Sequence, residues 1–329
     1  MERDQLRINI FIDYSEKTFI DKALEIFQYQ YKNNSIYHTF VDGCKINPQT
    51  VTQLSEIPFL PVELFKTNAI KSGNFKGEII FTSSGTTGTE TSKHHVKELK
   101  LYQEAFVNSF YNFYGKIEDY VFLALLPSYL ERKGSSLIYM MEHLIAKSGD
   151  KRSGFFLQEH NELFELLLQL HIEKKKVVLI GVTFALLDFA ENFSLDFPEL
   201  IVMETGGMKG KRKEMIRAEV HQLLKPAFGV KAIHSEYGMT ELLSQAYSKG
   251  AGIFQTPPWM KILIREMNDP MQITKQGVSG AINIIDFANL DSCSFIATQD
   301  IGKLLNDSTF EVIGRFDYSD IRGCNLMVE

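Results

Sequence analysis

The stretch FTSSGTTGTETSKHH, Phe81–His95, places two glycines among hydroxyl side chains directly after the apolar residues of a predicted strand. Gly85 and Gly88 allow backbone N–H groups to converge on one point, because no Cβ stands in the way. Such a nest of donors suits an anion. Further hydroxyl donors are available at Thr82, Ser83, Ser84, Thr86 and Thr87. The stretch is not a Walker A loop, and its composition alone leaves open a solvated linker, an ordinary turn or a phosphate-binding loop.

The segments around this loop alternate between strand and helix patterns. Apolar runs predict strands at 78–82, 120–127, 176–182, 199–205 and 230–237. Helical spacing predicts helices at 15–32, 98–114, 135–147 and 161–173, the first with Ser15 as N-cap. The near-continuous apolar runs at 176–182 and 199–205 are typical of strands covered on both faces. The pattern predicts an α/β fold whose core contains mostly parallel strands.

The pattern changes after about residue 250. Short predicted strands at 259–266, 279–287, 295–300 and 310–316 are separated by Gly, Asp, Asn and Pro, and long helices disappear. We therefore expect three parts: an N-terminal helical or irregular segment packed on the core (1–75), an α/β core (76–250) and a β-rich subdomain (251–329).

Bulk properties exclude several classes of protein. The chain has 329 residues, 44% hydrophobic and 23% charged, with a net charge of −6, so nothing favours nucleic-acid binding. The best membrane candidate, Val177–Leu187, is too short to span a bilayer, and no secretory signal is visible. Cys44, Cys293 and Cys324 form no CxxC pair, which argues against a disulfide framework or a zinc site. We expect a cytoplasmic protein.

A second chemical motif is HSEYGMTELLSQAY, His234–Tyr247, which follows a predicted strand, where α/β proteins place ligands. Tyr237 could stack on a base, and Glu241 could hold Mg²⁺ with phosphate oxygens completing the shell. A plain strand-to-helix turn with an exposed glutamate is the alternative.

Two further motifs lie near the end of the chain. Asp300, in ATQDIGKL, can accept two hydroxyl hydrogen bonds from one sugar, and Arg315, in VIGRFD, offers a planar donor fork after Gly314. Each of these segments alone is a common turn.

The four motifs in this order resemble the adenylate-forming superfamily of acyl-CoA synthetases, luciferases and peptide-synthetase adenylation domains. The matching residues are TSSGTTG, YGMTE, QD and GRFD, and METGGMKG resembles the glycine pair beside the adenine. The resemblance implies that 76–250 is a nucleotide-binding core like the large domain of these enzymes, that ATP and Mg²⁺ are cofactors, and that the chain is a ligase forming an acyl adenylate.

The resemblance also implies roles for single residues. The hydroxyl-rich loop would bind phosphate, Thr240 would contact the α-phosphate and Glu241 would hold the metal. Asp300 and Arg315 would hold ribose. The nucleotide-binding residues near the base would be Gly206, Gly207, Tyr237, Gly238 and Met239.

A narrower resemblance is to the LuxE-type acyl-protein synthetases, on the chain's short length and its RGCNL ending. It spans roughly residue 55 to the end and is strongest over 200–247 and 312–326. It implies that the small C-terminal domain of full synthetases is absent, that the substrate is a carboxylic acid, expected to be fatty, and that the acyl group passes from AMP to Cys324, as in an acid–thiol ligase. An acyl reductase subunit or an acyl carrier protein would be the partner.

Some features depart from the superfamily pattern. Its loop usually runs Gly-x-Pro-Lys, whereas GTETSK lacks the proline and places Lys93 two positions late, so Lys93 is not assigned to phosphate. His94, His95 and His234 lie near motifs without metal-ligand spacing, and we expect them to be solvent-facing or structural. Two other functions stay open: a short phenylacetate-type acyl-CoA ligase, and a non-catalytic partner subunit.

Overall fold

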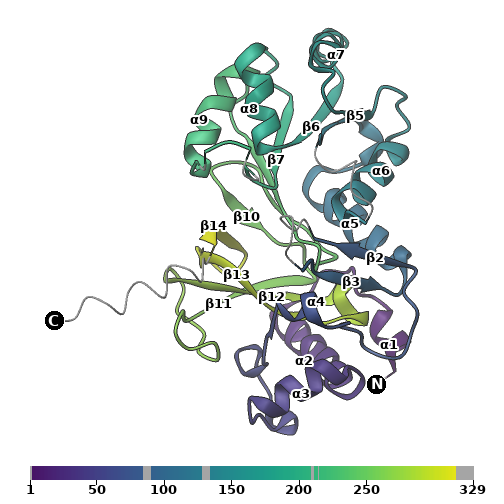
Figure 1. Ribbon diagram of the computed structural model, residues 1–329, viewed down its shortest axis with the longest axis vertical. Coiled ribbons are helices and arrows are strands. Elements are labelled where there is room, and N and C mark those ends of the chain that lie inside the picture. Colours follow the sequence, from purple (N-terminus) through teal and green to yellow (C-terminus); the bar gives the residue numbers. More distant parts are fainter. Residues whose placement is uncertain (1, 84–89, 128–133, 209–210, 214, 316–329) are drawn as a thin grey trace, which may run out of the picture.

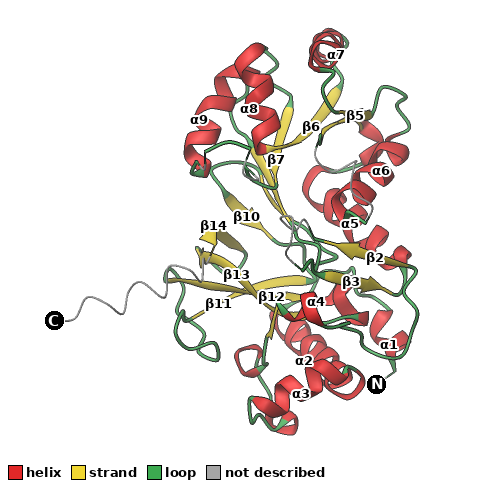
Figure 2. Cartoon of the chain, viewed as in Figure 1, coloured by secondary structure: helices red, strands yellow, loops and turns green. Residues whose placement is uncertain are grey.

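A computed structural model describes residues 2–83, 90–127, 134–208, 211–213 and 215–315. Its centre is one mixed sheet with the strand order β11-β12-β13-β14-β10-β9-β8-β7-β6-β4-β5, and β1 pairs with β13 beside this path (Figure 1). The predicted α/β fold is thereby confirmed, with helices and strands distributed as Figure 2 shows.

Five neighbouring strands form the parallel half of the sheet. They are β4 (Tyr120–Leu125), β5 (Gly154–Phe156), β6 (Lys176–Val182), β7 (Ile201–Thr205) and β8 (His234–Tyr237). Every residue of β4 is buried, as are all but the first residues of β6 and β7, because helices cover both faces. Figure 1 shows α8 and α9 on one side of these strands and α5 and α6 on the other.

Five helices belong to this half, and the first three follow the predicted positions closely. They are α5 (Leu99–Tyr114), α6 (Ser136–Ser148), α7 (His160–Ile172), α8 (Thr183–Asn192) and α9 (Arg217–Phe228). The apolar run at Val177–Leu187 is a buried strand that leads into α8. No helix in the described part of the chain combines the length and apolar character needed to cross a membrane.

The remaining strands of the sheet form an antiparallel half. They are β9 (Ala246–Ser248), β10 (Ile253–Gln255), β11 (Met260–Arg265), β12 (Ser279–Asp286), β13 (Phe295–Leu304) and β14 (Thr309–Arg315). Strand β8 joins the two halves, because it pairs parallel with β7 and antiparallel with β9. The sheet therefore runs across residues 250 and 251 without a break, and the predicted domain boundaries stay a prediction.

The N-terminal helices pack beneath the antiparallel half (Figure 1). They are α1 (Arg3–Arg7), α2 (Glu16–Asn33) and α3 (Ser35–Gly43), and the short α4 (Leu64–Thr67) follows β1 (Leu60–Pro61). Ser15 caps α2 as predicted, since its hydroxyl accepts the Thr18 N–H at 3.2 Å. Single 3-10 turns lie at Pro48–Thr50, Leu54–Glu56, Ile117–Asp119 and Phe287–Asp291.

Two expectations differ from the structure. The strand before the hydroxyl-rich loop, β2 (Ile79–Thr82), pairs only with β3 (Lys93–Val96) in a separate antiparallel hairpin and does not join the main sheet. The segment KHHV was not predicted as a strand because its composition is polar. In addition, β8 begins at His234 rather than at residue 230.

Candidate active site

The glycine pair and the YGMTE motif follow two neighbouring parallel strands. Strands β7 and β8 pair through Met203 with His234 and Glu204 with Ser235, so the residues after both strands lie at one edge of the sheet. Gly206 and Gly207 turn there with φ values of 74° and 66°, which favour glycine. This edge is where open α/β sheets bind ligands.

Two acidic side chains on neighbouring strands, Glu204 and Glu236, lie at this edge, and their pKa values are shifted in opposite directions. Burial raises the pKa of Glu236 to about 7, although the Thr205 hydroxyl donates to its Oε2 at 2.6 Å. Burial also opposes ionisation of Glu204. This effect is outweighed by three neighbours, His221, Arg217 and Ser235, which lower the pKa of Glu204 to about 2. The His221 ring lies 3.7 Å from the carboxylate, which is too distant for a hydrogen bond.

The Glu236 side chain leaves no space for a Cβ at position 238, which is occupied by Gly238. A Cβ at this position would lie 2.5 Å from Glu236 Oε1, which is closer than side-chain atoms approach. Met239 is half-buried against the core, and its carbonyl accepts the Leu242 N–H at 3.0 Å. Both residues thus shape the turn that leads from Tyr237 to Glu241.

Tyr237 and Asp300, separated by more than sixty positions, are in direct contact. The Tyr237 hydroxyl donates to Asp300 Oδ2 at 2.6 Å, and the edge of its ring packs against Phe254 and Phe310, both at 5.9 Å between centroids. Burial raises the pKa of both groups, and for Asp300 the Tyr237 hydroxyl and the Arg315 charge oppose the rise. The contact brings the second and third motifs together, while stacking of Tyr237 on a base stays a prediction.

Arg315 lies opposite Asp300 across the β13–β14 ladder. Its Nη2 donates to Gln299 Oε1 at 3.1 Å, and Gln299 Nε2 donates to Glu63 Oε1 at 2.6 Å. The third and fourth motifs therefore form one cross-strand pair, next to a polar chain that reaches the N-terminal third of the protein.

Thr240 and Glu241 follow in the turn after Gly238. The side chain of Glu241 is 6% exposed, so the predicted exposed glutamate of an ordinary turn is wrong. Burial raises its pKa, opposed by the Ser92 hydroxyl and the charges of Arg315 and Lys66. A buried carboxylate with so little compensation fits a cation.

No cluster of three or more metal-ligating side chains occurs among the described residues. A Mg²⁺ ion held by one carboxylate, with its remaining ligands from phosphate and water, needs no such cluster. Glu241 therefore fits the predicted metal role, which stays a prediction.

Only the base of the hydroxyl-rich loop lies within the described residues. The Thr82 N–H donates to the Gly134 carbonyl at 2.8 Å, and Ser83 and Ser92 exchange two hydrogen bonds at 2.9 and 3.1 Å. The other predicted positions of this loop lie outside the described residues: they are Ser84, Gly85, Thr86, Thr87 and Gly88. The candidate nucleophile Cys324 also lies outside the described residues.

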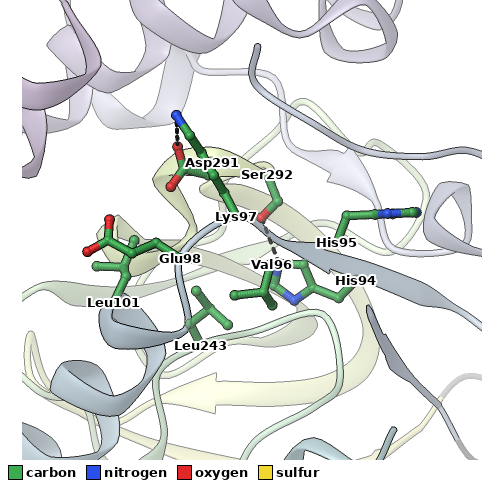
Figure 3. A pocket seen from close by; sticks show the side chains of 9 residues that line it. All are labelled: His94, His95, Val96, Lys97, Glu98, Leu101, Leu243, Asp291 and Ser292. Atoms are coloured by element: carbon green, nitrogen blue, oxygen red, sulfur yellow. Dashed lines mark hydrogen bonds and ion pairs between the residues drawn. The ribbon is translucent and has the colours of Figure 1, made fainter. Parts of the chain in front are cut away.

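His94 contacts the site, and sequence reasoning assigned it no such role. The ring is 1% exposed, so it is not solvent-facing, and it lies between the Thr240 carbonyl and Ser292 Oγ, 2.9 Å from each. Figure 3 shows the contact with Ser292. Strand alternation is the signal that finds it: with Lys93 and His95 facing outward, His94 and Val96 face inward.

Asp286 and Asn289 also hold the turn and were missed. Asp286 Oδ2 accepts the N–H groups of Leu243 and Ser244 at 3.2 and 2.9 Å. Asn289 donates through Nδ2 to the Glu241 carbonyl at 2.7 Å and accepts the Leu243 N–H at 3.0 Å. Their sequence context, DFANLD, has the composition of an ordinary loop.

Comparison with known proteins supports the fold. No family model and no curated protein matches the chain in sequence. ATP-bound MatB from Rhodopseudomonas palustris matches 74% of this chain and 49% of its own, with 15% identity and a TM-score of 0.54. The 2-hydroxyisobutyryl-CoA ligase in its postadenylation state, in complex with R3-HIB-AMP, matches 92% and 68%, with 12% identity and a TM-score of 0.62.

These likenesses bear on architecture rather than on activity, because the identities are low and the chain spans about half the length of MatB. The second of these proteins is named as a CoA ligase, and the large mixed sheet described above matches the fold of the adenylate-forming ligases. The chain therefore has the α/β fold of the adenylate-forming ligases.

Proposed function

We propose that this protein activates a carboxylic acid with ATP as an acyl adenylate and then transfers the acyl group to a protein thiol. One observation carries the proposal: segments far apart in the sequence meet at one edge of the sheet. Tyr237 contacts Asp300, Asp300 lies opposite Arg315, and Thr240 is tied to the hairpin that carries the hydroxyl-rich loop. The solved structures with this fold include one with bound ATP and one in complex with an AMP conjugate.

The residues support this chemistry in a definite way. A carboxylate is a poor electrophile, and joining it to AMP provides a good leaving group. The attack increases negative charge on the α-phosphate, which Thr240 and the N–H groups of the hydroxyl-rich loop would stabilise. Glu241 would hold Mg²⁺, which supplies positive charge to the phosphate oxygens. Asp300 and Arg315 would orient the ribose, and Gly206 and Gly207 would allow close approach of the base.

ATP–pyrophosphate exchange with a panel of carboxylic acids, including fatty acids of increasing chain length, tests the first step. We expect exchange that depends on the acid and that falls about 10²-fold in Glu241→Gln, because a charge stabiliser is lost. The exposed Glu165→Gln on α7 serves as the matched control and is expected to retain full exchange. Absence of exchange with every acid, together with no binding of ATP or an acyl-sulfamoyl adenosine, would contradict the proposal and favour a non-catalytic subunit.

The second step needs a thiolate. Burial raises the pKa of Cys44, and burial raises that of Cys293 to about 12, so neither thiol among the described residues suits the role at neutral pH. This supports Cys324, which Arg322 lies near in sequence. The fatty nature of the acid rests on the LuxE-type resemblance alone.

Cys324→Ser tests the thiol. We expect the variant to form acyl-AMP at the wild-type rate but to retain no labelled acyl group after denaturing electrophoresis, while Cys44→Ser labels normally. Undiminished thioester labelling of Cys324→Ser would exclude this cysteine as the acceptor.

A second candidate is a short acyl-CoA ligase. It is favoured by one of the solved structures, a 2-hydroxyisobutyryl-CoA ligase in complex with 2-HIB-AMP and CoA in the thioesterification state. Adding CoA to the exchange reaction distinguishes the two, because only a CoA ligase converts the acyl adenylate into acyl-CoA.

A further inference from the structure

A buried histidine connects the hairpin of the hydroxyl-rich loop to the turn that carries Thr240 and Glu241. His94 lies on β3, and its ring contacts the Thr240 carbonyl through Nδ1 and Ser292 through Nε2, both at 2.9 Å. The edge of the ring packs against Phe65, with 5.8 Å between centroids. The ring is buried and therefore has a partner on each nitrogen within the protein.

The partners determine where the proton lies. A carbonyl oxygen can only accept, so Nδ1 must carry the hydrogen. Burial lowers the pKa of His94 to about 4, so the ring is neutral near neutral pH. Nε2 then keeps its lone pair and accepts from the Ser292 hydroxyl. The contact thus specifies one tautomer, Nδ1–H.

The hydrogen bond from His94 is important because its acceptor, the Thr240 carbonyl, belongs to the turn that carries Glu241. Asn289 donates to the Glu241 carbonyl at 2.7 Å, so two successive carbonyls of the turn are fixed by side chains from different segments. His94 is the donor that comes from the hairpin of the hydroxyl-rich loop. It ties the two segments that would bind phosphate and metal to each other.

We propose that His94 is a positioning residue: through its Nδ1–H bond to the Thr240 carbonyl it sets the distance between the turn of Thr240 and Glu241 and the β2–β3 hairpin. The proposal rests on the proposed function. A displacement of about 1 Å in such groups can lower a rate about 10²-fold, since transition-state contacts depend steeply on geometry.

Nuclear magnetic resonance of the full chain tests the contact without any activity measurement. In protein labelled with ¹⁵N-histidine, one of the eight histidines should show a neutral ring protonated on Nδ1 near pH 7 and should remain neutral to about pH 5. The signal should disappear in His94→Asn. A ring protonated on Nε2, or a charged ring, would overturn the proposal.

Two variants separate the two nitrogens. The amide of asparagine occupies the place of Nδ1 and can donate to Thr240, whereas the amide of glutamine reaches the place of Nε2 and can bond only to Ser292. Each variant keeps one of the two contacts, so we expect the two variants to be similarly stable. Their melting temperatures check this expectation. His95→Gln, on the opposite face of the same strand, is the control outside the contact.

We expect His94→Gln to lower kcat for ATP–pyrophosphate exchange at least about tenfold with a smaller change in KM for ATP, and His94→Asn to stay within about threefold of wild type. Equal activity of both variants, whether high or low, would overturn the proposal, because then the Thr240 bond does not decide the rate. Failure of the proposed function looks different: wild-type protein shows no exchange, while the tautomer measurement still reports on the contact.

Discussion

At the scale of single residues, the two glutamates near the ends of β7 and β8 show how burial and neighbouring groups together set the pKa of a carboxyl group. Glu204 has Arg217 at 3.0 Å and the Ser235 hydroxyl at 2.7 Å, which stabilise its ionised form. Burial is the main cause of the raised pKa of Glu236; the charge of Glu204 adds to the rise and the Thr205 hydroxyl opposes it. Adjacent positions in one ladder thus titrate at opposite ends of the carboxylate range.

This difference predicts how Glu236→Gln changes stability with pH. A raised pKa means that the folded state favours the protonated carboxyl, so its stabilisation is present below about pH 4.5 and is lost as pH rises through about 7. The glutamine variant does not titrate. It should equal wild type at pH 4 and exceed it at pH 8 by at most about 3 kcal/mol of unfolding free energy. Urea unfolding at both pH values measures this.

Glu204→Gln is the matched control, and the opposite sign is expected. Its lowered pKa stabilises the folded state at neutral pH, an effect lost as pH falls toward about 2, so the variant should be less stable than wild type at pH 7. If both variants changed stability in the same direction at pH 8, the assigned charge states would be wrong.

Residues show where sequence reasoning ends. Tyr237, Glu241, Asp300 and Arg315 could be predicted as site residues because their motifs are local in the chain. His94 could not, because its importance comes from Thr240 and Ser292, which are distant in sequence. Burial of a polar side chain between two partners is a tertiary property that no local pattern reports.

At the scale of elements, the β2–β3 hairpin is separate from the main sheet and is attached to the rest of the protein by contacts of single residues. One is Gly134, whose carbonyl accepts the Thr82 N–H at 2.8 Å. Gly134 has a φ of +89°, and a Cβ there would lie 3.1 Å from Thr82 Oγ1 and 3.2 Å from the Ile80 carbonyl. A side chain at this position would press on the strand that leads into the hydroxyl-rich loop.

Gly134→Ala should therefore lower both stability and exchange activity. Backbone strain costs about 1–2 kcal/mol for an alanine at positive φ, and the contacts with β2 add to it. Gly149→Ala is the matched control, since its φ is +71° and nothing lies within 4 Å of its Cβ. A loss of exchange in Gly149→Ala equal to that in Gly134→Ala would show that the contact with β2 is unimportant.

Elements were also the best-predicted level of structure. The apolar runs of β6 and β7 and the helical spacing of α5, α6 and α7 identified these elements to within about two residues. The hairpin partner β3 was missed because half of its side chains face outward and its burial comes from a separate contact. Strand order across the sheet could not be predicted, since it depends on pairings between distant segments.

At the scale of the whole molecule, the N-terminal helices support the site from below. The Gln30 side chain is fully buried in α2, donates to the carbonyls of Asn289 and Leu290 at 3.0 Å and accepts the Ser294 N–H at 2.9 Å. Asn289 in turn holds Glu241. The sequence suggested no role for the first part of the chain. In the structure it holds Asn289, which in turn holds the turn of Thr240 and Glu241.

Gln30→Leu should destabilise the protein by several kcal/mol. It removes the bonds to the buried Leu290 carbonyl and Ser294 N–H, at about 1–3 kcal/mol each, while the Asn289 carbonyl keeps the Ser292 N–H at 3.0 Å. Gln28→Leu on the same helix removes one bond, to the Pro48 carbonyl at 2.6 Å, and should cost less. Chemical denaturation compares the two. A smaller loss for Gln30→Leu than for Gln28→Leu would contradict this support.

The pairing of β1 with β13 has a consequence for biosynthesis. Leu60 lies beside Ile296, so nearly the whole polypeptide must leave the ribosome before this short strand finds its partner. Until then the first helices lack the strands that cover their apolar faces in the folded protein, and nascent chains with such distant contacts fold late and aggregate readily. Yield in a heterologous host should therefore respond to slower translation and to chaperone supply.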